Sequence, residues 1–347
     1  MLADLDDLLT ALFVLVDDLL PVRRGAGRRP QISDSELVTL AVAQVLLDCH
    51  SERRFLRLAR DRLRHLFPYI PLQPGYNKRL RSLAPTLCVV IEHLARISPS
   101  FCERVRLLDS TPVPCGASRE TRKRSELAGW AAYGYCASHS RPFWGLRLYL
   151  LCAPDGMPIS FCLAPANEPE REVAASLLDR ARQRGMLGGG EVIVTDKGFA
   201  GRQFEALVAS LGATLVRPDR KDEPRRFGSL GRVRQWIESI YQTTKSQLSL
   251  ELHGGHIPAG VWTRICQRVL ALAAGVWHSW TLWEHGLIHA PGRHQRANHA
   301  NRYVLGHRHQ PDIVGQAARP GGRIGHPPAD LGNVVDDSCG DVRHERK

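Results

Sequence analysis

Three acidic residues have the chemical type and the sequence context to bind metal ions together. Asp109 ends the apolar stretch of LLDSTPV, Asp196 follows the apolar stretch of VIVTDKGF, and Glu238 lies in RQWIESIY, which has a helical pattern. If the two apolar stretches are strands of one sheet and the helix packs against that sheet, the three carboxylates can converge. Mg²⁺ or Mn²⁺ is the natural cation for such a set of oxygen ligands.

Each of these acids, taken alone, also has a purely structural explanation. Asp before Ser-Thr-Pro and Asp-Lys-Gly after a strand are both common turn sequences, in which the carboxylate accepts hydrogen bonds from backbone N–H groups. Glu238 can equally be a surface residue of its helix. The metal hypothesis therefore depends on the combination of the three acids.

The helix around Glu238 is predicted to be amphipathic, with a polar edge beside its apolar face. On a helix that advances about 100° per residue, one face collects side chains that we expect to pack on the sheet. They are Val233, Ile237, Ile240, Thr244 and Leu248. The neighbouring edge carries Arg234, Glu238, Tyr241 and Lys245, so two basic residues can hold phosphates beside the carboxylate.

Two basic segments precede this helix and are predicted to contact an anionic partner. One is SRETRKR, after the first acid, and the other is RPDRKDEPRR. Their basic residues are Arg119, Arg122, Lys123, Arg124, Arg217, Arg220, Lys221, Arg225 and Arg226. A solvated loop is the alternative for each segment. An arginine-rich helix near residues 52–64 has the same two interpretations, a solvated face or a DNA contact.

The composition favours a globular protein with an acidic partner such as nucleic acid. Of the 347 residues, 43% are hydrophobic and 24% charged, which excludes collagen-like, coiled-coil and mostly disordered chains. Lys and Arg outnumber Asp and Glu by 47 to 35, a net charge of +12. The nine cysteines never form a CxxC pair, which indicates reduced thiols without a structural zinc. The N-terminal helix lacks the basic region of a signal peptide, so we expect no membrane targeting.

The sequence predicts three regions. Residues 1–100 read as helices, and Ser33 with Glu36 forms a capping box at one helix start. Residues 101–283 read as three strands followed by alternating helices and strands, which predicts an α/β fold with a mixed sheet flanked by helices. Residues 284–347 are a low-complexity tail that we expect to be disordered. The HGGH sequence beginning at His253 is interpreted as a glycine cap after the helix of Glu238 rather than a metal site.

At this point the sequence resembles the bacterial insertion-sequence DDE transposases, whose catalytic domain has the ribonuclease-H-like fold. The resemblance extends over roughly residues 30–280. Its blocks are SDSELVTLAVAQ, FLRLARDRLRHLFP, YNKRLRSL, LLDSTPVP, GYCASHSRPFWGLRLYLLCAPDGMPISFCLAPANEPER, VIVTDKGFAG, VRQWIESIYQTTKSQLSLELHGGH and LALAAGVWHSW.

The resemblance implies a role for each acid and for two basic residues. It makes Asp109, Asp196 and Glu238 the catalytic residues and the ligands of two Mg²⁺ or Mn²⁺ ions. The R-x3-E-x6-K signature of these transposases is met by Arg234, Glu238 and Lys245, which assigns both basic residues to DNA phosphates. The tyrosine that often lies three residues before the arginine is replaced here by Gly231.

The resemblance also implies a function and its partners. It predicts cleavage of double-stranded DNA at transposon ends and transfer of the resulting 3′-OH into target DNA, by a homodimer in a synaptic complex. It further implies a cytoplasmic protein associated with the bacterial nucleoid, with residues 1–100 binding transposon ends. Two alternatives remain open at this point: a catalytically inactive DNA-binding protein derived from a transposase, and a nuclease of the same fold without strand transfer.

Overall fold

A computed structural model describes most of the chain up to residue 284. The described residues are 2–21, 30–116, 119–136, 140–220, 223–224, 226 and 230–284. The tail predicted to be disordered lies outside this part, except for its first residue. One continuous cluster of buried hydrophobic side chains extends from the first helix through the sheet to the last helix. The sheet and the helices before and after it therefore share a core.

The described part of the first hundred residues is helical, as predicted. The helices are α1 (Leu2–Leu19), α2 (Asp34–Leu46), α3 (Glu52–Arg62), α4 (Gln73–Ser82) and α5 (Ala84–Ile97), followed by the 3-10 turn η1 (Pro99–Cys102). The capping box at the start of α2 is confirmed. Ser33 Oγ accepts from the Glu36 N–H at 3.0 Å, and Glu36 Oε2 accepts from the Ser33 N–H at 2.6 Å.

The predicted mixed sheet is confirmed. Its strands are β1 (Val105–Gly116), β2 (Ala132–Cys136), β3 (Arg141–Cys152), β4 (Pro158–Pro165), β5 (Val192–Val194) and β6 (Thr214–Val216). The order is β2-β3-β1-β5-β6, and β4 also pairs with β3. The pairs of β3 with β1, β2 and β4 are antiparallel, whereas β5 is parallel to both β1 and β6.

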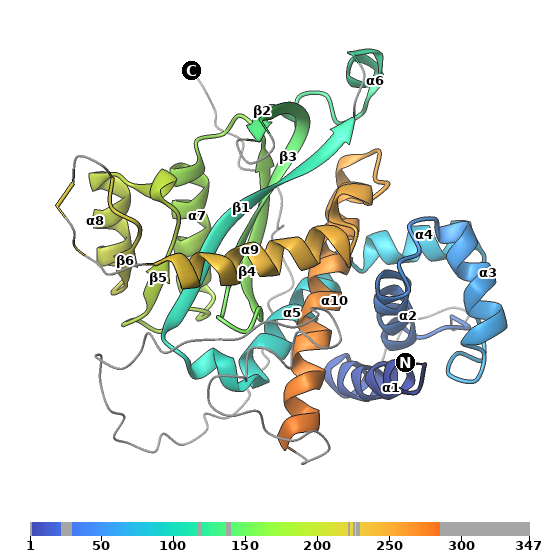
Figure 1. Ribbon diagram of the computed structural model, residues 1–347. Coiled ribbons are helices and arrows are strands. Elements are labelled where there is room, and N and C mark those ends of the chain that lie inside the picture. Colours follow the sequence, from blue (N-terminus) through green and yellow to red (C-terminus); the bar gives the residue numbers. More distant parts are fainter. Residues whose placement is uncertain are drawn as a thin grey trace.

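Two elements near the far end of β1 were not predicted. The strand β2 is short, and its residues alternate between half-buried and exposed, so the sequence AYGYC lacks the apolar run that marks the other strands. The basic segment after β1 contains a one- to two-turn helix, α6 (Arg119–Arg124). Both elements lie at the end of the sheet where β1 and β3 extend beyond their neighbours (Figure 1).

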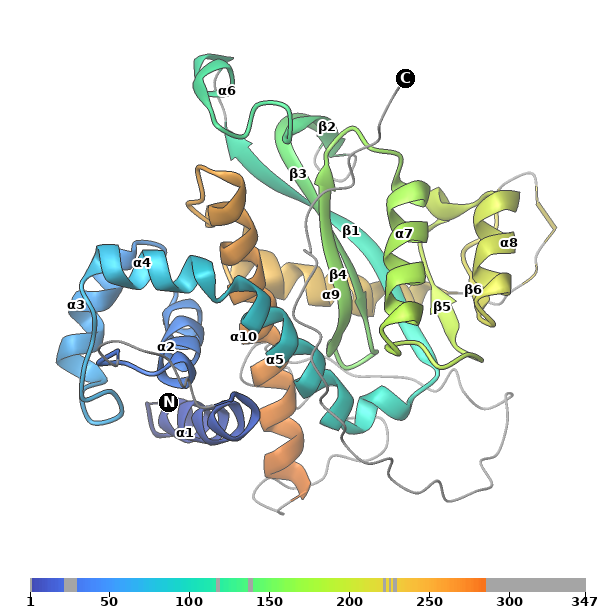
Figure 2. The same ribbon diagram turned by 180° about the vertical axis from the view of Figure 1, so that it is seen from behind.

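Helices cover both faces of the sheet. The helices α7 (Glu170–Gln183) and α8 (Arg202–Ser210) contact each other and lie over the face seen in Figure 2. On the opposite face, α9 (Gly231–Ser246) lies across β1 (Figure 1). Because α9 carries Glu238, this packing brings the helix of the third predicted acid to the strand of the first.

The end of α9 differs from the prediction. The helix was expected to include Leu248 and to end at the HGGH sequence, but it stops at Ser246 and is followed by the separate 3-10 turn η4 (Leu250–Leu252). The HGGH sequence therefore does not cap α9. Gly254 has a φ of +65° in the turn toward the next helix, and a Cβ on Gly255 would lie 2.7 Å from the Val261 Cα atom, so both glycines serve this turn.

The last described helix, α10 (Pro258–Glu284), joins the N-terminal helices to the sheet. It packs against α5, α2 and α1, and it also contacts β4, where Trp262 stacks on Phe161 with ring centroids 5.4 Å apart. Among the described residues, no helix has both the length and the apolar character needed to cross a membrane.

Candidate active site

Asp109 and Asp196 lie next to each other because of the register of two parallel strands. Leu107 of β1 pairs with Val194, the last residue of β5. Two residues further along each chain, β1 reaches Asp109 and the chain after β5 reaches Asp196. Equal steps along paired parallel strands keep residues side by side, so the two acids face the same end of β5. The structure thus brings together two of the three predicted acids.

The environment of Asp109 disfavours the ionised form of its side chain. Burial, and then the nearby carboxylates of Asp196 and Glu170, raise the pKa of Asp109 to about 7, although the Ser110 N–H and Arg147 act in the opposite direction. The Ser110 N–H donates to Asp109 Oδ1 at 2.7 Å. A carboxyl with this pKa is only partly ionised near neutral pH, and an adjacent cation would favour its ionised form.

Asp196 is half-buried and lies in a turn, as its structural explanation predicted, and it also lies beside Asp109. It caps the 3-10 turn η3 (Lys197–Phe199), and its side chain accepts from the Gly198 N–H. A Cβ on Gly198 would lie 3.1 Å from Asp196 Oδ1 and 3.5 Å from Glu170 Oε2. The two carboxylate oxygens therefore border a single small space, which the absence of a side chain at this position keeps open.

Glu170 is an acid of the site that sequence analysis missed. It is the first residue of α7, and its Oε1 accepts from Arg147 Nη1 at 2.6 Å and from Ser110 Oγ at 3.1 Å. Arg147 also donates to Ser110 Oγ at 2.9 Å and to the Tyr135 carbonyl oxygen at 2.8 Å. The sequence offered only an acidic residue in a first helical turn, which commonly does no more than stabilise the helix dipole.

The helix α9 contacts the strand of the first acid through Tyr241. The Tyr241 hydroxyl donates to the main-chain carbonyl of Asp109. The predicted apolar face of α9 is confirmed for Ile237, Ile240 and Thr244, which are all buried. Leu248 is buried too but follows the end of α9, and the Val233 side chain lies outside what the structure describes. Tyr241 lies on the predicted polar edge, so this edge, rather than another part of α9, adjoins Asp109.

Glu238 is on the correct helix but does not join the two aspartates. It lies one turn before Tyr241 and is exposed to solvent. Within the described ranges, no three His, Cys, Asp or Glu side chains form a group that could hold a metal ion. The structure therefore pairs Asp109 with Asp196 and leaves Glu238 on the adjoining helix.

The predicted DNA-binding residues have different environments. Lys245 is half-buried in the last turn of α9. On α6, Arg122 is half-buried, whereas Lys123 and Arg124 are exposed. Arg225 and the side chains of Arg119 and Arg234 lie outside what the structure describes, although Arg234 falls in the first turn of α9.

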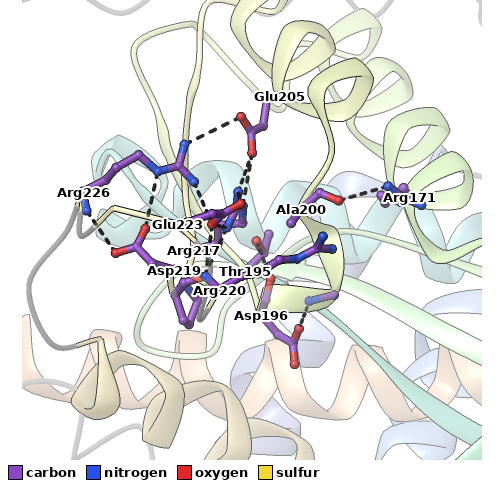
Figure 3. Close-up of polar contacts among 12 residues, drawn as sticks. Arg171, Thr195, Asp196, Ala200, Glu205, Arg217, Asp219, Arg220, Glu223 and Arg226 are labelled. Atoms are coloured by element: carbon purple, nitrogen blue, oxygen red, sulfur yellow. Dashed lines mark hydrogen bonds and ion pairs between the residues drawn. The ribbon is translucent and has the colours of Figure 1, made fainter.

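Arg226 belongs to a group of paired charges that we call the Arg217 cluster, made of Arg217, Glu205, Glu223, Asp219 and Arg226. The Arg217 side chain, only 4% exposed, binds Glu205 at 2.9 Å and Glu223 at 2.7 Å. Arg226 lies 3.4 Å from Asp219 and 3.6 Å from Glu223. Figure 3 shows the Asp196 carboxylate pointing away from this cluster. The cluster holds three acids against two arginines, so it has no surplus of positive charge.

Both ring nitrogens of His253 have hydrogen-bond partners in the backbone. Its Nε2 is 3.0 Å from the Pro114 carbonyl oxygen, and its Nδ1 accepts from the Gly255 N–H at 3.1 Å. Burial lowers the pKa of His253 to about 4, so the ring is neutral and both nitrogens serve the fold. The HGGH sequence thus has a structural role, in the turn before α10 rather than in the predicted cap of α9.

Sequence comparison identifies the family. A family model described as a transposase DDE domain matches residues 100–273, which is half of the chain. The chain belongs to this family of transposases. Among curated proteins, no sequence matches it.

Several solved transposase structures resemble the chain loosely. The piggyBac transposase synaptic complex with hairpin DNA has 10% identity and a TM-score of 0.42, with 87% of this chain and 76% of that chain covered. The Mos1 mariner paired end complex with Mn has 12% identity and a TM-score of 0.22, with coverage of 80% and 86%. The assignment rests on the family match, because TM-scores this low add no support to it.

Proposed function

We propose that this protein is an insertion-sequence transposase that cleaves DNA at transposon ends and joins the 3′-OH to target DNA. The observation that carries the proposal is the placement of Asp109 and Asp196 side by side, next to the helix that bears Glu238. Membership of the transposase family supplies the reaction class. Double-stranded DNA is the proposed substrate, and two copies of the chain are proposed to act in the synaptic complex.

The residues present fit divalent cations. Asp109 has a raised pKa because it is buried near two other carboxylates, and an adjacent cation would relieve that repulsion. Asp109, Asp196 and Glu238 are the proposed ligands of Mg²⁺ or Mn²⁺. Two bound ions would make water or a 3′-OH nucleophilic near neutral pH and would stabilise the leaving oxygen.

The remaining residues of the site orient the acids and hold the substrate. The Ser110 N–H orients the Asp109 carboxylate, Tyr241 fixes the Asp109 main chain, and the Gly198 N–H orients Asp196. Lys245, at the other end of the same edge of α9, is placed to bind a phosphate of the DNA strand that reaches Asp109. Preorganised acids of this kind need little rearrangement when the substrate binds.

The proposal is tested with DNA that carries the transposon ends, a target plasmid and Mn²⁺. The expected result is cleavage at the ends followed by joined products, both lost in Asp109→Asn. Cleaved ends without joined products would show a nuclease, and DNA binding without cleavage would show an inactive DNA-binding protein. Melting curves provide a second measurement: Mg²⁺ should raise the Tm of the wild type more than that of Asp109→Asn.

A further inference from the structure

The strand β2 carries two aromatic side chains that are largely exposed to solvent. The described residues include eight large hydrophobic side chains that are exposed, and only three of these are aromatic. Tyr133 and Tyr135 are 52% and 57% exposed and lie two residues apart on β2. The third, Tyr69, is 39% exposed and lies in the N-terminal helical region. Two exposed rings on one short strand suggest a binding surface.

The two tyrosines are on the same face of the sheet as Asp109. Tyr133 pairs with Trp144, Tyr135 pairs with Pro142, and Asp109 pairs with Leu150. Directly paired residues share a face, and even-numbered residues of β3 all point to one face, because side chains alternate along a strand. Along β3, six to eight residues separate the tyrosine positions from that of Asp109, which corresponds to roughly 20–26 Å.

The helix α6 brings a basic residue against one of these rings and exposes two more. The Arg122 guanidinium lies over the Tyr133 ring, 4.0 Å from its centroid, in a cation–π contact. Lys123 and Arg124 are exposed, and Lys123 has one weak partner, Glu120 at 3.6 Å, with both side chains largely exposed. We call Arg122, Lys123, Arg124, Tyr133 and Tyr135 the α6–β2 surface. It combines positive charge with two largely exposed aromatic side chains, of which the Tyr133 ring is covered by Arg122 on one face.

We propose that the α6–β2 surface binds unpaired nucleotides of the DNA strand that leads away from the catalytic acids. This inference rests on the proposed function, which it deepens by naming a second contact region for the same substrate. Tyrosine rings stack on bases, and the cations of α6 hold the phosphates between them. In an intact duplex the base faces are covered by neighbouring base pairs, so exposed rings select bases that have lost their partners.

A protein partner is the competing occupant, since Tyr and Arg also dominate many protein interfaces. The charge decides against it: the sequence of α6, RETRKR, has four basic residues and one acid. A polyanion neutralises this excess along its whole length, and salt-dependent binding is the signature of that mode.

The test uses the full-length protein and two fluorescent DNA probes that differ only in a short unpaired overhang on one strand. We expect the wild type to bind the overhang probe more tightly than the blunt duplex. Tyr133→Ala/Tyr135→Ala should weaken binding of the overhang probe by about tenfold and leave blunt-duplex binding unchanged. The double Phe variant should retain the preference, and Tyr69→Ala, at an exposed tyrosine far from this surface, is the matched control.

A second variant tests the charges separately from the rings. Lys123→Ala/Arg124→Ala should lower the salt dependence of overhang binding by about 1.4 in slope, at about 0.7 for each contact with a single strand. The inference is overturned if the wild type binds both probes equally or if the tyrosine variants keep the overhang preference. Failure to bind either probe would instead overturn the proposed function, so the two failures are distinguishable.

Discussion

Two groups of charged side chains lie at the carboxyl ends of the neighbouring parallel strands β5 and β6, and they differ in how their charge is balanced. Asp196 follows β5 and adjoins Asp109, while Arg217 follows the neighbouring strand β6. In the Arg217 cluster, the Arg217 guanidinium lowers the pKa of Glu223 to about 2. In the candidate active site, by contrast, burial and neighbouring acids raise the pKa of Asp109 to about 7.

The opposite pKa shifts distinguish acids that are paired with arginines and stabilise the fold from acids whose charge the protein leaves largely uncompensated. The carboxylates of the Arg217 cluster already have cations, so their charge helps to fix the chain after β6. In the part of the chain that the structure describes, Asp109 and Asp196 accept from the Ser110 and Gly198 N–H groups, and Arg147 partly offsets the charge of Asp109. A cation from solution can compensate the remaining negative charge. Counting acids along the sequence cannot distinguish these two situations, because the distinction depends on which arginine reaches which carboxylate.

The largest expected effect compares Glu238 with Glu223. Glu238→Gln should reduce DNA cleavage by at least about 10²-fold and leave DNA binding intact or slightly stronger, since it removes a negative charge from the proposed metal site. Glu223→Gln removes an acid that Arg217 already neutralises, and cleavage by the folded protein should persist. Cleavage rates and DNA affinity are measured for both variants. The opposite pattern would move the third catalytic acid into the Arg217 cluster.

Most of the fold could be predicted from the sequence, because long apolar runs mark β1, β3 and β4, and periodic patterns mark the helices. The strand β2 could not, because Tyr133 and Tyr135 are exposed and its pairing with β3 is a long-range contact. The same limit applies to the end of α9, where an apolar pattern continued past the hydrogen-bonded helix.

The candidate site was predicted in part. Asp196 follows the end of β5, as predicted, whereas Asp109, predicted to end its strand, lies inside β1, which continues to Gly116. The register of β1 with β5 places the two acids at the same level. Glu170 was missed because its contacts with Ser110 and Arg147 come from three separate segments. Arg217 was predicted to contact DNA because of its basic neighbours, but it is buried between two acids, one of which lies on α8.

The next largest effect is on stability. Arg217→Met removes the nearer cation from Glu205 and Glu223 and leaves them only the more distant Arg226. It should lower the free energy of unfolding by up to about 3 kcal/mol, the lower end for buried pairs, because both acids are partly exposed. Arg220→Ala, at an exposed arginine of the same segment, should change it by less than about 0.5 kcal/mol. Urea unfolding measures both values. Equal effects would mean that the Arg217 cluster has no special structural role.

Asp109 and Glu223 should change the free energy of unfolding in opposite directions as pH rises. Because the pKa of Asp109 is raised from 3.8 to about 7, its protonated form stabilises the fold below pH 3.8, and this contribution disappears as pH rises through 7. From pH 4 to 8 without metal, the wild type should lose about 2 kcal/mol relative to Asp109→Asn, after a discount for partial exposure.

Glu223 provides the contrasting measurement. Its pKa is lowered, so its contribution is present above pH 4.5 and is lost as pH falls toward 2. Relative to Glu223→Gln, the wild type should therefore lose stability on acidification. Urea unfolding of the three proteins across pH, in the presence of a chelator, determines both slopes. Parallel pH profiles for Asp109→Asn and the wild type would contradict the assignment of Asp109 as an uncompensated acid.

The smallest expected effect compares two basic residues, Lys245 and Arg226, both predicted from sequence to contact DNA. Lys245 forms no ion pair with another described residue, so Lys245→Ala should reduce the slope of log affinity against log salt by about 0.9, the value for one duplex phosphate. Arg226 lies among the acids of the Arg217 cluster. To bind a phosphate, Arg226 would have to break its ion pairs with these acids, and the free energy gained from the phosphate would largely cancel against the pairs that are lost. Arg226→Ala should therefore change the slope less than Lys245→Ala does. An equal decrease would show that Arg226 exchanges its carboxylate partners for DNA, and the Arg217 cluster would then be part of the DNA-binding surface.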